Sequence, residues 1–333
     1  MSQFSNGEGI VDRAAGVVLG GAIGDALGAG YEFSAPPKPE EVTMLPGTLT
    51  RAPAGHWTDD TAMAIAVLEV ACEKGTLVSA AALAAVGDRF LEWYRSGPSD
   101  IGVHTAAVLG LARDGADLNR AARALQDNRP QSASNGSLMR TGPVALAHLG
   151  DDIALTTAST AVSTLTHVHR EAVEACVLWS HTNDVAVRTG VLTSPRVGLP
   201  FIDITRRDYW EQKISEAEEK DPLEFTPNGY VVTSLQAAWS AIHKTKRVPN
   251  HFEAGLRQAV AIGDDTDTVA AVAGYLLGAV YGTKAMPTEW VDGLSGWPGI
   301  YDATDLVRLA AGAVSGNNRT RYTQPPRNQC ITM

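Results

Sequence analysis

Two short acidic segments, one near each end of the chain, have residue types that suit a metal site. They are Gly55-His56-Trp57-Thr58-Asp59-Asp60-Thr61 and Gly263-Asp264-Asp265-Thr266-Asp267-Thr268, and each is followed by an apolar stretch typical of a helix. Taken singly, each segment is most simply a helix start, where threonine caps the helix and carboxylates face the positive end of its dipole. Two copies favour another interpretation, because their five carboxylates, brought together, would repel one another unless cations lay among them. We therefore predict that the two segments converge on a binuclear metal site.

The kind of ion follows from the ligand types. Mg²⁺, Mn²⁺ and Ca²⁺ prefer the carboxylate and hydroxyl oxygens that both segments offer. An EF-hand is excluded, because Asp265 and Asp267 are followed by neither the required glycine nor the distal glutamate. Zinc is disfavoured, because neither segment offers cysteine or paired histidines. Two oxygen-ligated ions could activate water or orient sugar hydroxyls, so the residues indicate a metal-dependent hydrolase and leave phosphoester and glycosidic chemistry open.

Three further carboxylates are candidates, and each has a structural alternative. Asp25 falls near the end of an apolar helix predicted over 13–28, where it needs a partner, water or an exposed position. Glu32 stands at the root of the proline-rich loop 34–55, which is longer than packing normally needs and suggests a covering segment. It could be a catalytic base or a lid hinge, or a solvated surface residue. Asp100 reads first as a helix N-cap.

Small polar residues at 134–140 form a second kind of candidate. Exposed backbone N–H groups in such a run suit a phosphate at the start of a helix, although a simple tight turn is the favoured interpretation of the pattern by itself. His167 falls inside a segment with a helical pattern, 152–180, and His169 two positions later would point away from it. His167 is therefore a poor half of a metal pair and could line a polar pocket or be structural.

The elements expected to position these residues are all helical. The chain has no convincing alternating strands and no tandem repeat, so we predict a single all-α domain over 1–316. Residues 194–228 read as a peripheral insertion with a solvated helix, and 317–333 as a polar, disordered tail. Helices are predicted over 13–28, 62–71, 73–97, 103–113, 152–180, 235–242, from 251 toward the second acidic segment, and over 302–314.

Composition narrows the class of protein. The 333 residues are 44% hydrophobic and carry a net charge of −10, which is ordinary for a globular protein and argues against general binding to nucleic acid or acidic membranes. The three cysteines lack metal or redox spacing, and the N-terminus does not read as a signal peptide. We expect a cytoplasmic protein without a membrane partner, and a monomer by default.

The ordered set of motifs resembles the ADP-ribosylglycohydrolase family, which includes the dinitrogenase-reductase-activating glycohydrolases. The resemblance extends from about Arg13 to Gly282, and the pairing of the two acidic motifs in this order is its most specific part. The motifs are Gly20-Gly21-Ala22-Ile23-Gly24-Asp25-Ala26-Leu27-Gly28 with Glu32, Thr58-Asp59-Asp60-Thr61, Asp100-Ile101-Gly102, Ser134-Asn135-Gly136-Ser137-Leu138-Met139-Arg140, Thr166-His167, and Gly263-Asp264-Asp265-Thr266-Asp267-Thr268.

This resemblance implies a compact orthogonal helical domain with two Mg²⁺ ions, or Mn²⁺, in a central cleft. It implies hydrolysis of the bond between the anomeric carbon of ADP-ribose and an acceptor, with Glu32, Asp60 and Asp100 as catalytic residues. Asp100 would favour an arginine acceptor by binding its guanidine. The implied metal ligands are Thr58, Asp59, Asp60, Asp265, Asp267 and Thr268. The implied contacts to ADP-ribose are Ser134, Asn135, Gly136, Ser137, Leu138, His167 and, lining the same cleft, Tyr230.

Other readings stay open at this point. The acceptor could be serine or a nucleic-acid base, or the substrate could be another ADP-ribose derivative. The protein could also bind ADP-ribose without cutting it, or a two-metal phosphohydrolase could release AMP. Asp264 departs from the family by replacing a common glycine, which adds charge beside the ligands. The charged stretch from Arg206 to Lys220 has no assigned role.

Overall fold

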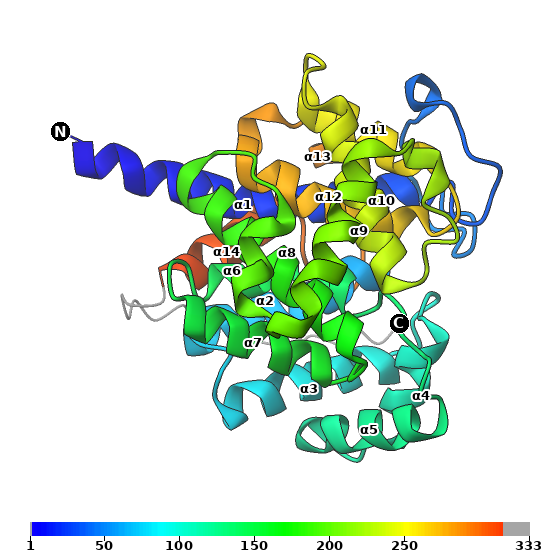
Figure 1. Ribbon diagram of the computed structural model, residues 1–333, viewed down its shortest axis with the longest axis vertical. Helices are drawn as coiled ribbons and strands as arrows, with labels where there is room; N and C mark the ends of the chain where they lie inside the picture. Colours follow the sequence, from blue (N-terminus) through cyan, green and yellow to red (C-terminus); the bar gives the residue numbers. More distant parts are fainter. Residues whose placement is uncertain (1, 316–333) are drawn as a thin grey trace, which may run out of the picture.

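The computed structural model describes residues 2–315, and this part of the chain is built from α-helices joined by loops and short 3₁₀ turns. Figure 1 shows the helices packed against one another in several directions, which confirms the predicted all-α orthogonal architecture. Within residues 2–315 the only strand-like pairings are two isolated bridges. The helices are α1 Ser2–Gly28, α2 Asp59–Lys74, α3 Ala80–Arg95, α4 Val103–Leu111, α5 Leu118–Asn128, α6 Gly142–Leu146, α7 Asp152–Thr164, α8 Arg170–Thr189, α9 Arg207–Glu219, α10 Val231–Thr245, α11 His251–Ala261, α12 Thr266–Tyr281, α13 Thr288–Asp292 and α14 Ala303–Val314.

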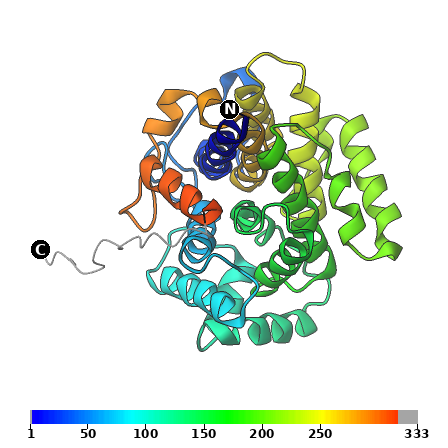
Figure 2. The ribbon, with the colours of Figure 1, turned by 90° about the vertical axis from the view of Figure 1, so that its left-hand side faces the viewer.

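Helices α1 and α12 form the closest helix pair of the core, because small residues recur at three- and four-residue spacing along 13–28. A Cβ atom on Gly20 would lie 2.2 Å from the carbonyl oxygen of Gly274, so only glycine permits this approach. At the end of α1, a Cβ on Gly28 would lie 2.4 Å from the Cα of Asp267. Figure 2 shows the two helices side by side, α1 in blue and α12 in gold. The pairing brings the end of α1 to the start of α12.

Several predicted helices have different boundaries in the structure: α1 begins at Ser2 instead of Arg13, and α10 extends over Val231–Thr245 instead of 235–242. Two other differences have a clear local cause. The helix predicted over 73–97 begins at Ala80, because Gly75 ends α2 in the left-handed region and the Ser79 hydroxyl caps the next helix. The helix predicted over 152–180 is interrupted between α7 and α8. His169 caps the new helix by accepting the N–H of Glu171 through its ring nitrogen, a local hydrogen bond that competes with a continuous helix. His167 therefore lies in a loop.

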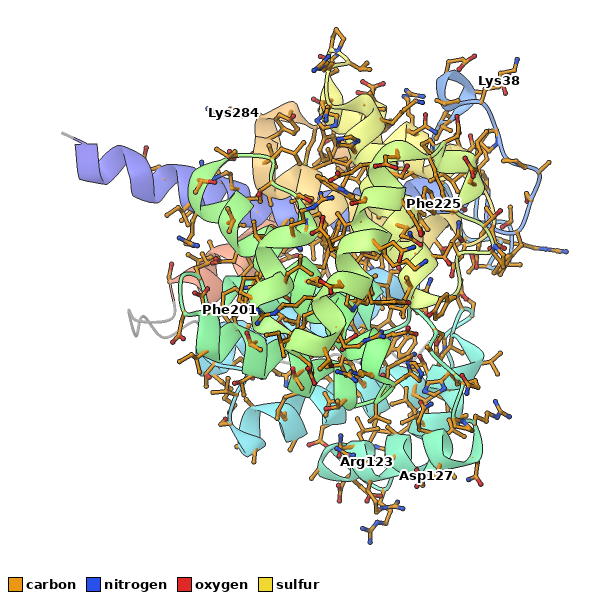
Figure 3. The ribbon with its side chains drawn as sticks, in the orientation of Figure 1. Lys38, Arg123, Asp127, Phe201, Phe225 and Lys284 are labelled. Atoms are coloured by element: carbon orange, nitrogen blue, oxygen red, sulfur yellow. The ribbon has the colours of Figure 1, made fainter. Side chains whose placement is uncertain are left out.

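The segment 194–228 is tied to the rest of the molecule at several points. Its helix α9 buries Trp210 and Ile214, so α9 is amphipathic and not wholly solvated. The ring of Phe201 stacks on His181 of α8 with ring centroids 3.8 Å apart, and Phe225 is buried. Figure 3 labels both phenylalanines.

Buried apolar residues from α1 to α14 form one continuous core. No helix in the range 2–315 has the length and apolarity needed to cross a bilayer. The tail predicted over 317–333 lies outside the described residues.

Candidate metal and substrate site

Asp25 holds the start of α2, where the first acidic segment lies. Its carboxylate, fully buried at the end of α1, accepts the backbone N–H of Thr58 at 2.9 Å and that of Thr61 at 2.9 Å. It also accepts both threonine hydroxyls, at 2.8 Å and 2.6 Å. Burial raises the pKa of Asp25 to about 6 against the opposing effect of these four bonds. Because the proton of the Thr58 hydroxyl goes to Asp25, the lone pairs of that oxygen are left for another partner.

The starts of α2 and α12 meet, so the two acidic segments converge. Thr58 Oγ1 lies 3.4 Å from Asp60 Oδ2 and 3.5 Å from Asp267 Oδ2. From the other side, Thr268 Oγ1 lies 3.4 Å from the same oxygen of Asp60. Asp60 Oδ1 is buried and has no hydrogen-bond partner in the structure. A buried carboxylate oxygen without a partner costs free energy unless a cation satisfies it.

Glu32 joins this acidic cluster from the root of the long loop. One oxygen each of Glu32, Asp265 and Asp267 lie within 4.8 Å of one another. Burial, and then the neighbouring carboxylates, raise the pKa of Glu32 to about 9 and that of Asp59 to about 8. The pKa values of Asp60 and Asp267 are also raised, by burial first. Together these carboxylates are stable in the ionised state only beside positive charge, and the all-oxygen donor set fits Mg²⁺, Mn²⁺ or Ca²⁺.

The carboxylate of Asp264 supports the backbone and is not part of this set of metal-ligand candidates. Its backbone is in the left-handed region (φ +67°), and its carboxylate accepts the N–H of Asn228 at 2.7 Å. The side chain of Asn228, fully buried, accepts the N–H of Asp265 at 2.9 Å and donates to the carbonyl of Gly263 at 3.1 Å. Asp264 and Asn228 thus fix the turn that presents Asp265. No sequence pattern singles out Asn228, because it stands in a proline- and glycine-containing segment typical of an ordinary turn.

The segment 133–138 lies against this turn. Its backbone pairs with that of 229–231, since Asn135 N–H donates to Gly229 and Val231 N–H donates to Ala133. The side chain of Asn135 donates to Asp265 Oδ2 at 2.8 Å, so it supports the acidic cluster directly. The side chains of the next residues point inward: Ser137 is bonded to Ser163 at 3.0 Å, and Leu138 is fully buried.

Two side chains of this region remain available to a ligand. Ser134 is half-buried, and its hydroxyl lies 2.9 Å from Nε2 of His167, whose other ring nitrogen is 2.7 Å from the Thr166 hydroxyl. His167 itself is 2% exposed, so it can act on a ligand only indirectly, through its contact with Ser134. Tyr230 is 40% exposed, and its hydroxyl donates to Glu171 at 2.5 Å. Glu171 also accepts bonds from Tyr209 and Arg206, a connection between the segment 194–228 and the cleft that sequence reasoning missed.

A cavity of about 370 Å³ adjoins the acidic cluster. Asp59 and Asp100 line it, and so do the residues Trp57, Trp93 and Trp297, of which Trp297 is half-buried and the other two are buried. Asp100 Oδ2 is buried without a hydrogen-bond partner, and burial, followed by the charge of Asp265, raises the pKa of this carboxyl. The cavity therefore combines a carboxylate oxygen without a hydrogen-bond partner and a half-buried tryptophan, Trp297, a combination suited to a planar cation.

Comparison with known proteins connects this geometry to a family. A sequence model described as ADP-ribosylglycohydrolase matches residues 6–320. ADP-ribosylarginine hydrolase Tri1 of Pseudomonas putida (strain GB-1) is 32% identical over 282 residues, which are 82% of this chain and 71% of Tri1. ADP-ribosyl-[dinitrogen reductase] glycohydrolase of Rhodospirillum rubrum is 29% identical over 284 residues, 82% of this chain and 87% of that protein. A solved structure described as an ADP-ribosylglycohydrolase-related protein complex matches with a TM-score of 0.71 at 30% identity, over 92% of this chain and 98% of the other.

Proposed function

Because the chain belongs to the ADP-ribosylglycohydrolase family, we propose that it is a metal-dependent hydrolase that removes ADP-ribose from modified arginine. The bond cleaved would be the one at the anomeric carbon of the distal ribose. The observation that carries this proposal is that two features adjoin: a buried carboxylate cluster, and a cavity that is lined by an unpartnered carboxylate oxygen and by tryptophan residues. Asp59 belongs to both, so a bond held at the cluster would have its leaving group in the cavity.

The residues that would hold two Mg²⁺ ions, or Mn²⁺, are Thr58, Asp59, Asp60, Asp265, Asp267 and Thr268. The unpartnered oxygen of Asp60 and the raised pKa values of the cluster support this set, because both are relieved by bound positive charge. When bound, such ions supply charge that keeps the carboxylates ionised and polarises oxygen atoms of substrate and water.

The side chains supply the remaining chemistry. Water adds its oxygen to the anomeric carbon, the carbon–nitrogen bond breaks with its electron pair passing to the guanidine, and the guanidine nitrogen takes up a proton. Glu32 would accept the proton that the attacking water loses. The positive charge that develops on the ribose ring would be stabilised by the carboxylate of Asp60.

Arginine is the favoured acceptor because of the cavity. A guanidinium group is planar, donates two parallel hydrogen bonds to a carboxylate, and stacks on aromatic rings. Asp100 offers the carboxylate, and Trp297 is a half-buried ring in the wall. A serine hydroxyl would use neither feature. The name of the relative Tri1, an ADP-ribosylarginine hydrolase, agrees with this choice.

Two coarser proposals accompany this one. We propose that residues 1–316 form one domain, because segments from opposite ends of the chain contribute to one site. We propose the cytoplasm as its location, since Cys72 and Cys176 are both free thiols and suit a reducing compartment.

The test is a panel of ADP-ribosylated substrates linked through arginine, serine or a nucleic-acid base, with products identified by mass spectrometry. Release of intact ADP-ribose from the arginine linkage is expected, with a loss in Asp100→Ala. Release of AMP would instead indicate a phosphohydrolase. ADP-ribose binding without turnover of any linkage would indicate a relative that recognises the nucleotide only.

A further inference from the structure

Arg140 is a buried cation that the proposed reaction does not use. Its side chain is 0% exposed, and within residues 2–315 none of the ion pairs includes it. Its guanidinium donates instead to the carbonyl of Gly136 at 3.1 Å and to the hydroxyl of Thr166 at 2.6 Å, and it lies 4.6 Å from the ring centroid of Phe90. A buried charge held by neutral groups alone is costly, which points to a role beyond packing.

The bond from Arg140 fixes the direction of the next hydrogen bond. An arginine side chain can only donate, so the Thr166 oxygen must accept from it. The hydroxyl hydrogen of Thr166 then has Nδ1 of His167 as its partner, 2.7 Å away. We assign Nδ1 as the acceptor, which puts the proton of the neutral imidazole on Nε2. With the opposite tautomer, the buried Thr166 hydroxyl hydrogen would have no partner and would cost free energy.

A second histidine is held in the same way beside the first. Nε2 of His104 lies 2.9 Å from the backbone carbonyl of Thr166, which can only accept, so His104 also carries its proton on Nε2. The two rings are 4.5 Å apart, and burial lowers the pKa of each below the ordinary value, which keeps both rings neutral. A neutral His167 with a fixed tautomer is therefore consistent with its surroundings.

The chain of bonds ends at Ser134. The Nε2–H of His167 donates to Ser134 Oγ at 2.9 Å, so the hydroxyl hydrogen of Ser134 is left to point elsewhere. Ser134 is half-buried, next to Asn135, which contacts the acidic cluster. We propose that Arg140, through Thr166 and His167, sets the Ser134 hydroxyl as a dedicated hydrogen-bond donor for an anionic oxygen of the bound ligand. Arg140, Thr166 and His167 are positioning residues in this scheme. The scheme rests on the proposed function only in identifying that anion as the diphosphate of ADP-ribose.

The direct test is the tautomer of His167, read by ¹⁵N NMR of the full chain labelled at histidine, with the His167 signals assigned from their loss in His167→Gln. The expected spectrum at neutral pH has a protonated Nε2 and a bare Nδ1. Thr166→Val, which keeps the shape and removes the hydroxyl, is expected to give a mixture of tautomers, while Thr166→Ser restores the wild-type spectrum. Thr164→Val is the matched control, because that hydroxyl is bonded only to the carbonyl of Ala161 in its own helix.

The second readout is calorimetric binding of two probes, ADP-ribose and adenosine, in the presence of Mg²⁺. Ser134→Ala is expected to weaken ADP-ribose binding roughly 10-fold or more, the loss typical of a hydrogen bond to a charged group, and to leave adenosine unchanged. Thr166→Val should weaken ADP-ribose binding several-fold, and Thr166→Ser and Thr164→Val should not.

The outcomes separate the two proposals. A wild-type spectrum with a protonated Nδ1 overturns the relay, and so does an unchanged tautomer together with unchanged ADP-ribose affinity in Thr166→Val. If Thr166→Val fails to fold, the wild-type spectrum and Ser134→Ala still decide. If the wild-type protein neither binds nor hydrolyses ADP-ribosyl compounds, the proposed function is wrong. The tautomer measurement would still decide whether the hydrogen bonds from Arg140 to Ser134 run as proposed.

Discussion

The two sides of the candidate site are held together by different physics. On one side, carboxylates at the starts of α2 and α12 crowd together with no ion-pair partner among residues 2–315, and burial raises their pKa values. On the other side, Ser134, Thr166 and His167 satisfy one another with neutral hydrogen bonds that end at Arg140. The acidic side needs something from outside the chain, whereas the hydroxyl side is complete and presents one free donor. We expect variants on the first side to change metal dependence, and variants on the second to change ligand affinity.

The largest effect is expected from Asp267→Asn, which keeps the size of the side chain and removes its charge. If Asp267 is a metal ligand, turnover should fall by about 100-fold or more, since ligand charge is a main term in divalent-ion binding. The measurement is steady-state hydrolysis together with Mn²⁺ binding by calorimetry.

Asp264→Asn is the matched control for that substitution. The carboxylate of Asp264 accepts a bond from Asn228, and an amide oxygen can do the same. Turnover and Mn²⁺ affinity should both stay near wild type. Equal losses in the two variants would show that charge anywhere in the turn matters, and the distinction between ligand and support would fail.

Asn228→Ala is expected to destabilise the turn that presents Asp265. Its buried side chain bonds to Gly263 and Asp265, and truncation leaves these groups without partners. The free energy of unfolding should fall by about 2–3 kcal/mol, measured by urea denaturation. Asn119→Ala, a half-buried asparagine on α5, is the control and should cost less, because its lost partners can reach water. Equal losses of unfolding free energy in the two variants would contradict the supporting role assigned to Asn228.

The metal-free protein should lose stability as pH rises. Burial, and then Asp100, raise the pKa of Glu32 in the folded chain to about 9, above its value in the unfolded chain. The folded state thus holds more protons, so the stabilising contribution is complete at low pH and disappears as pH rises toward about 9. Thermal melting with a chelator should show this slope, and saturating Mg²⁺ should flatten it. A slope that is absent with the chelator would contradict the crowding of unpaired carboxylates.

The smallest effect is expected from Glu171→Gln, on the hydroxyl side. Glu171 accepts the Tyr230 hydroxyl, so the substitution should loosen Tyr230 and raise KM a few-fold while kcat stays constant. Glu211→Gln, a glutamate of α9 paired with Arg196, is the control and should leave both constants unchanged. A fall in kcat in the first variant would place Glu171 nearer the reaction than the structure implies.

The sequence predicted one side of the site much better than the other. The acidic segments could be found because a helix start has a local pattern. The glycine spacing in 13–28 indicated a helix that neighbours can approach closely, but it did not identify α12 as that neighbour. The break between α7 and α8 was missed, since it depends on a ring nitrogen of His169 acting as a cap. Asn228 and Glu171 could not be predicted, because their partners lie far away in the sequence and no spacing encodes them.

The most direct test of the account is hydrolysis of an ADP-ribosyl-arginine peptide with Mg²⁺ and with a chelator, for wild type and Asp60→Ala, with the released nucleotide identified. We expect wild type to release intact ADP-ribose only when Mg²⁺ is present, and Asp60→Ala to release none. Release that is unaffected by the chelator, or that persists in Asp60→Ala, would contradict it.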